Sequence, residues 1–117
     1  MRSIAIWFCL GLLLLTTSCG FNDIRDRSAK LEKLLATNAS LSAVESSIGQ
    51  IPIYEPGSPE WNGLRNSCAR HPDRWYQQLV QKIDKASTFG ATTTPSMQTW
   101  IFLDDKDRLI DFDVGTQ

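Results

Sequence analysis

MQTWIFL (Met97–Leu103) and RLIDFDV (Arg108–Val114), joined by the polar run DDKD (104–107), decide the fold of this chain. Both outer stretches are rich in apolar and aromatic residues, and two such stretches joined by a short polar run predict a β-hairpin. Alternation along the second strand predicts that Leu109 and Asp111 point outward, so that one face packs on helices and the other is partly wet. A hairpin alone is marginally stable in water, so we expect helices to cover its apolar face.

Helical spacing of apolar residues predicts three helices before the hairpin, at Asn22–Ala36, Leu41–Ile48 and Pro72–Ala86. In the second of these, Ser42 to Glu45 fits a capping box, and Gly49 fits the end of the helix. We therefore expect an α+β domain in which two or three helices pack on a small antiparallel sheet that ends in a C-terminal β-hairpin.

The sequence predicts little regular structure in the segments outside these helices and the hairpin. The run IPIY (51–54) is apolar but contains Pro52, so an edge strand or an extended connector is expected. Residues 55–63 hold two prolines and two glycines and are predicted to form a loop. Residues 87–96 (STFGATTTPS) carry no charge and are predicted to form a flexible connection.

The N-terminus carries the clearest indication of where the protein works. Arg2 is followed by the uncharged run Ile4–Leu15, and the small residues 16–18 (TTS) then precede Cys19. A positive start, an apolar stretch of roughly 7–15 residues and small residues at its end are typical of a signal peptide. The sequence therefore predicts a signal peptide over residues 1–18 and a protein that works outside the cytoplasm.

A cysteine at the end of such a leader resembles the lipobox of bacterial lipoproteins, although Thr16 stands where that pattern prefers Leu. The resemblance implies that Cys19 is lipidated, becomes the mature N-terminus and anchors the chain to a membrane of the bacterial cell envelope, which is the outer membrane if the cell is Gram-negative. Residues 19–40 are then a lipid-attached tether or helix, and residues 41–117 the α+β domain. Two alternatives stay open: cleavage that leaves Cys19 unmodified, and an uncleaved anchor over Ser3–Asn22.

Composition argues against several classes of function. The formal net charge is −1, and no basic patch or stripe indicates a nucleic-acid partner. The acidic residues between Asp104 and Asp113 lack the glycine and the closing glutamate of a calcium loop, so they are expected to form a solvated turn and strand face. The chain has a single histidine, and no spacing typical of a metal or cofactor site is recognised. We expect no cofactor and no metal.

Three residues of the mature chain are candidates for functional chemistry. Cys68 has no second cysteine to pair with unless Cys19 is unmodified, in which case a Cys19–Cys68 disulfide would suit a soluble secreted binding or inhibitor protein. Cys68 and His71 are close enough in sequence for a thiol-dependent enzyme, but Pro72 disfavours a helix through both. Trp61, in the predicted loop, either anchors that loop to the core or belongs to a partner surface together with the hairpin edge.

The order of elements resembles the SmpA/OmlA family of envelope lipoproteins, which assist the assembly of outer-membrane proteins. The resemblance rests on Cys19, on the helix Leu41–Ile48 that ends at Gly49, and on the hairpin Trp100–Phe112. It departs from the family at the helix Pro72–Ala86, which is extra. With no catalytic constellation recognised, we expect a non-enzymatic envelope lipoprotein that contacts an unidentified envelope protein at a membrane surface.

Overall fold

The computed structural model describes residues 19–116, and the side chains from residue 22 onward. The predicted signal peptide over residues 1–18 lies outside the described residues. The described chain is an α+β domain with helices α2 (Cys19–Ala36), α3 (Leu41–Ile48), α4 (Pro59–Arg70) and α5 (Arg74–Lys85), and with strands β1 (Ile53–Tyr54), β2 (Thr88–Thr93), β3 (Gln98–Leu103) and β4 (Leu109–Gly115).

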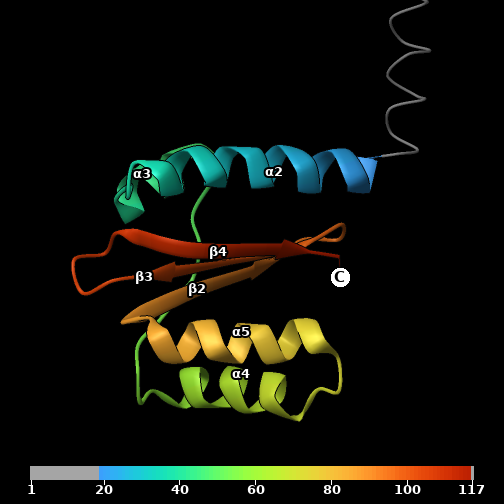
Figure 1. Cartoon of the computed structure of the whole chain (residues 1–117), viewed down its shortest axis with the longest axis vertical. Helices are drawn as coiled ribbons and strands as arrows, with labels where there is room; N and C mark the ends of the chain where they lie inside the picture. The colour runs from blue at the N-terminus through green and yellow to red at the C-terminus, as the bar shows by residue number, and fades with distance from the viewer. Residues whose placement is uncertain (1–18, 117) are drawn as a thin grey trace, which may run out of the picture.

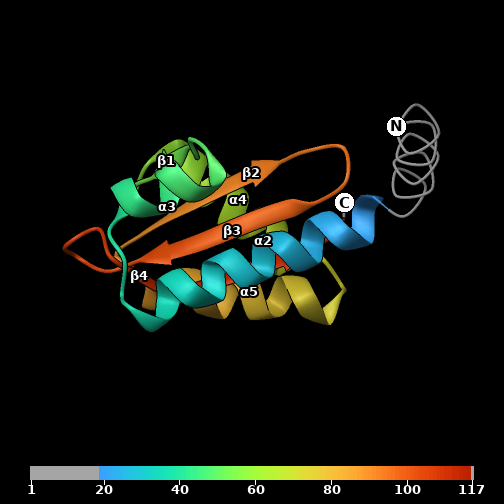
Figure 2. The same ribbon diagram turned by 90° about the horizontal axis from the view of Figure 1, so that it is seen from above.

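The strands form one antiparallel sheet in the order β1-β2-β3-β4, and its last two strands are the predicted C-terminal hairpin. Helices α2 and α3 cover one face of this sheet, and α4 and α5 cover the other (Figure 1). Seen from above, α2 runs lengthwise over β4, the strand that it packs on (Figure 2). The prediction that one sheet face is partly wet is therefore wrong, because the second pair of helices covers it.

Two segments predicted to be irregular are regular elements. Part of the predicted loop over residues 55–63 belongs to α4, whose first turn is capped by the Ser58 hydroxyl and has Pro59 as its first residue. The predicted flexible connection over residues 87–96 contains β2, which pairs with β3 along its whole length. The edge strand expected near Pro52 is confirmed as β1, and it pairs with Phe89 and Gly90 of β2.

Helices α2 and α3 are held on the sheet by a shared core. Leu31 of α2 and Val44 of α3 are fully buried and pack with Ile101, Leu103 and Leu109. Since Leu31 lies in this core, α2 is part of the domain, and the predicted division at residue 40 does not hold.

The predicted cap of α3 is displaced by two residues. The Ser40 hydroxyl accepts the Ala43 N–H at the start of this helix, whereas the prediction gave that role to Ser42. The Glu45 carboxylate accepts the Ile51 N–H at 3.3 Å and so binds the connection to β1 instead of completing a capping box. Gly49 ends the helix with a φ of 93°, as predicted.

The opposite face carries an aromatic core. Trp61 of α4 packs on Phe89 of β2, with ring centroids 4.7 Å apart, and Phe89 stacks on Trp100 of β3. Arg65 of α4 donates two hydrogen bonds of 2.7 and 2.9 Å to Asp84 of α5, which joins the two helices at their surface. The guanidinium holds the pKa of the Asp84 carboxyl below its ordinary value.

A bulge in the hairpin decides which residues of β4 are buried. Leu103 pairs with Leu109, but Phe102 pairs with Asp111, so Ile110 is an extra residue in β4. The extra residue turns Leu109 into the core beneath α2 and α3. The prediction that Leu109 points outward is therefore wrong, because strict alternation does not continue through a bulge.

Candidate functional site

The predicted lipid attachment residue stands at one end of the domain. Helix α2 begins at Cys19, and the β2–β3 loop and the C-terminus lie at the same end, whereas the β3–β4 turn lies at the other (Figure 1). The first turns of α2 are fixed to the sheet: Arg27 Nη1 donates to Thr99 Oγ1 at 3.0 Å, and Ser96 Oγ donates to an Asp23 carboxylate oxygen at 3.5 Å. The start of α2 therefore has a defined position relative to the rest of the domain.

Within residues 19–116, no helix combines the length and the apolar character needed to cross a bilayer.

Cys68 lies on the other side of the sheet from α2. It is a free thiol on α4, 4% exposed and packed in the aromatic core. Burial raises the pKa of this thiol above its ordinary value, which lowers the fraction present as the nucleophilic thiolate. A disulfide needs Cα atoms within about 7 Å. Because α2 and α4 cover opposite faces of the sheet, the fold gives no support to a Cys19–Cys68 bridge.

His71 organises the connection between α4 and α5. Its backbone N–H donates to the Cys68 carbonyl, and its Nδ1 accepts the Asp73 N–H at 3.1 Å. The imidazole stacks on the Tyr76 ring with centroids 3.9 Å apart. These contacts direct the ring toward α5 while the Cys68 thiol lies in the core, so the structure does not assemble the thiol–imidazole pair considered from the sequence.

Trp61 is not part of an exposed surface. Its side chain is 8% exposed and lies on the inward side of α4, against Phe89. The prediction of a partner surface at Trp61 is therefore wrong, because the segment forms a helix that turns the indole into the core.

The acidic run after β3 forms a turn stabilised by its own first residue. Asp104 Oδ1 accepts the backbone N–H groups of Lys106 and Arg108, both at 2.9 Å. These bonds, led by the one from Arg108, hold the pKa of the Asp104 carboxyl below its ordinary value. Asp107 has a φ of 57°, a left-handed conformation that closes the turn. Among residues 19–116, no group of three or more His, Cys, Asp or Glu side chains is placed to hold a metal ion.

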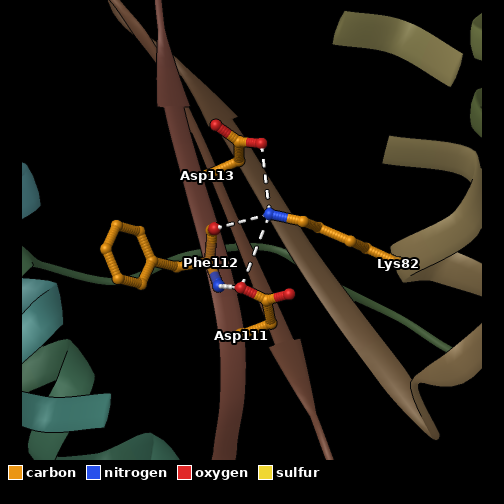
Figure 3. A network of polar contacts seen from close by, with 4 residues as sticks. All are labelled: Lys82, Asp111, Phe112 and Asp113. Atoms are coloured by element: carbon orange, nitrogen blue, oxygen red, sulfur yellow. Dashed lines mark hydrogen bonds and ion pairs between the residues drawn. The ribbon is translucent and has the colours of Figure 1, made fainter. Parts of the chain in front are cut away.

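Beyond the turn, β4 is an edge strand of the sheet whose exposed backbone is bound by one lysine (Figure 3). Lys82 of α5 donates to the Phe112 carbonyl at 3.1 Å and to Asp113 Oδ2 at 3.3 Å, and its Nζ lies 3.4 Å from Asp111 Oδ1. The same Asp111 oxygen accepts the Phe112 N–H at 2.8 Å. Both backbone groups of Phe112 that face away from β3 are thus occupied. We call these four residues the Lys82 clasp.

At the start of β4, the backbone groups of Leu109 are bound by residues of the α2–α3 turn. The Leu109 N–H donates to the Ala39 carbonyl at 2.8 Å, and the Asn38 side-chain amide donates to the Leu109 carbonyl at 2.9 Å. An edge strand recruits another strand through unpaired backbone groups, and here the chain itself occupies most of them. The hairpin edge expected to contact a partner is therefore closed to strand addition over this length.

Next to the clasp lies an exposed apolar residue that the sequence did not single out. Ile110 is 39% exposed, and it is the one exposed large hydrophobic side chain among the described residues. It borders an open pocket of about 380 Å³ between α5 and β4 whose lining also includes Gln78, Gln81, Lys85 and Phe102. We call this area the Ile110 surface. Only the bulge brings Ile110 to it, so a strict alternation of strand residues could not have identified it.

Comparisons of the chain with protein-family models, with curated proteins and with solved structures find no match.

Proposed function

We propose that this chain is a bacterial cell-envelope lipoprotein, anchored to a membrane by lipid on Cys19, that acts as a non-enzymatic protein-interaction module. The leader supports the anchor, because a basic start, an apolar run and small residues precede Cys19. The membrane is the outer membrane if the cell is Gram-negative, and the partner is a protein of the envelope.

The observation that carries this proposal is the unbroken helix from Cys19 into the domain core. Because α2 begins at the lipidation residue and is bound to the sheet through Arg27 and Leu31, a lipid on Cys19 sets the orientation of the whole domain. The end with the C-terminus then lies nearest the membrane, and the β3–β4 turn points away from it (Figure 1). A fixed orientation suits a module that presents a surface to another envelope protein.

The Ile110 surface is the best candidate for that contact. It combines an exposed apolar side chain with polar and charged neighbours, which is the composition of an interface centre with its rim. An interface that excludes water around Ile110 would bury its apolar area and leave the Lys82 clasp beneath it intact.

The two alternative functions have less support. A soluble binding or inhibitor protein with a Cys19–Cys68 disulfide would need cysteines that meet, and Cys68 is buried on the other side of the sheet from α2. A thiol-dependent enzyme would need an accessible thiolate beside a base, whereas burial raises the pKa of Cys68 and His71 stacks on Tyr76.

Site-specific photo-crosslinking tests the contact. With p-benzoylphenylalanine in place of Ile110, we expect one discrete adduct in irradiated whole cells, and we expect the Ile110→Asp variant to lose copurification of the same protein by at least about tenfold. Glu32, exposed on α2, serves as the control position for the photoreactive residue. Adducts of equal yield from both positions, or no adduct from position 110, would contradict the proposed surface.

A further inference from the structure

A second pocket opens on the α4–α5 side of the sheet, beside the short strand β1. It measures about 400 Å³ and is lined by eleven residues, none of which is charged. The walls include the rings of Tyr54, Tyr76 and Trp100, and the Cys68 thiol lies among them. We call this site the neutral pocket. Its volume falls in the range of about 300–1,000 Å³ that is typical of small-molecule sites.

Three polar side chains of the neutral pocket are joined in a chain of hydrogen bonds. Trp100 Nε1–H donates to Gln98 Oε1 at 3.3 Å, and Gln98 Nε2 donates to Tyr76 Oη at 3.2 Å and to the Thr116 carbonyl at 3.4 Å. The indole donor is therefore satisfied inside the protein, and the amide is fixed in orientation. Because the Tyr76 oxygen accepts the bond from Gln98, its own hydrogen can be donated to a ligand.

The composition of the lining indicates which ligands fit. A charged group that entered would lose its hydration without gaining an ion pair, since no lining residue carries an opposite charge. A flat apolar group would pack on the aromatic walls, and hydroxyls such as those of Ser67 and Tyr76 can hydrogen-bond to it. Pockets of this kind use a mostly apolar wall for affinity and a few polar groups for orientation.

We propose that the neutral pocket binds an uncharged small molecule with an apolar ring and at least one hydrogen-bonding group. The site is separate from the Ile110 surface, since the two share no lining residue: the neutral pocket lies between α4, the start of α5 and strands β1 to β3, whereas the Ile110 surface lies between the later part of α5 and β4. If the neutral pocket bound no ligand, the proposed protein contact at the Ile110 surface would still stand, and the reverse also holds.

Two dyes with the same ring system test the proposal. N-Phenyl-1-naphthylamine is uncharged, and 1-anilinonaphthalene-8-sulfonate carries one sulfonate on the same rings. With the mature chain carrying Cys19→Ser and no lipid present, we expect the uncharged dye to bind, with an increase in its fluorescence. The sulfonated dye should bind at least about tenfold more weakly. Equal affinities, or no binding of the uncharged dye, would overturn the proposal.

Matched tryptophan variants locate the binding. Ser67 lines the pocket and is exposed on α4, whereas its neighbour Asn66 is exposed and does not line it. Ser67→Trp should therefore raise the Kd of the uncharged dye at least about tenfold, and Asn66→Trp should leave it unchanged. Equal effects of the two variants would show that the dye binds elsewhere and would overturn the assignment.

Cys68 gives a second measurement that does not depend on dye fluorescence. In the mature Cys19→Ser chain it is the one remaining cysteine, because Cys9 lies in the leader. Saturating uncharged dye should slow the alkylation of Cys68 by iodoacetamide at least about fivefold in the Asn66→Trp chain and not in the Ser67→Trp chain. Alkylation at the same rate with and without dye would contradict binding beside Cys68.

Discussion

Leu31→Ala is expected to lower the free energy of unfolding by about 2–5 kcal/mol, the range for removing a leucine side chain from a packed core. Leu31 is fully buried between α2 and the sheet, where it packs in the cluster of Val44, Ile101 and Leu109. Since a domain of this size is stabilised by only about 5–15 kcal/mol, this loss is a large fraction of its stability. Denaturant unfolding of the mature Cys19→Ser chain measures the change.

Glu32→Ala is the matched control for Leu31→Ala. Glu32 is the next residue of α2 and is exposed, so its replacement should change the free energy of unfolding by less than about 0.5 kcal/mol. If Leu31→Ala were as mild as Glu32→Ala, α2 would be a tether outside the folded domain, and the orientation argument from Cys19 would fail.

Lys82→Met is expected to lower the free energy of unfolding by about 1–2 kcal/mol and to promote self-association. Methionine keeps most of the apolar stem but removes the ammonium, which binds the Phe112 carbonyl, lies between Asp111 and Asp113 and is 6.0 Å from the centroid of the Phe102 ring. Loss of a hydrogen bond to a charged group costs about 1.5–3 kcal/mol, reduced here because the group is partly exposed to water. Denaturant unfolding and sedimentation at increasing protein concentration measure the two effects.

Lys85→Met tests whether the clasp geometry, and not a general loss of charge, produces these effects. Lys85 is exposed one turn further along α5 and makes none of the clasp contacts. Its replacement should leave the self-association of the chain unchanged and change the free energy of unfolding by less than about 0.5 kcal/mol. Equal behaviour of the two variants would show that Lys82 does not close the β4 edge.

The sequence predicted the elements whose signals are local. The hairpin follows from two apolar, aromatic stretches around a polar turn, and the structure confirms it as β3 and β4. The helices α2, α3 and α5 follow from apolar residues at helical spacing, and Gly49 ends α3 as expected. In each case neighbouring residues alone contain the required pattern.

The missed elements carried weaker or contradictory signals. Gly63 and the prolines near Glu55 favoured a loop. However, Ser58-Pro59-Glu60 is a typical helix start, and the apolar residues that follow it lie at helical spacing: Trp61, Leu64 and Cys68. Strand β2 contains Gly90, which disfavours a strand in isolation. In the folded sheet a Cβ at this position would lie 2.5 Å from Ile51 and 2.8 Å from Ile53, so the close packing requires glycine.

The candidate sites depended on contacts distant in sequence and could be predicted least. The Lys82 clasp joins α5 to residues about thirty positions later in β4, and the neutral pocket combines residues from Pro52 to Trp100. The position of Ile110 depends on a bulge for which no residue pattern was recognised. Such arrangements arise from tertiary packing, which a pattern of neighbouring residues does not contain.

The intact mass of the chain extracted from membranes tests the central claim most directly. We expect the mass of residues 19–117 plus a diacylglyceryl group on the Cys19 sulfur, with any acyl group on its amine as a further addition. We also expect Cys19→Ser to abolish this species and to remove the protein from the lipid-anchored fraction. An unmodified chain that begins at Cys19 or later, or an uncleaved chain of residues 1–117, would contradict the account.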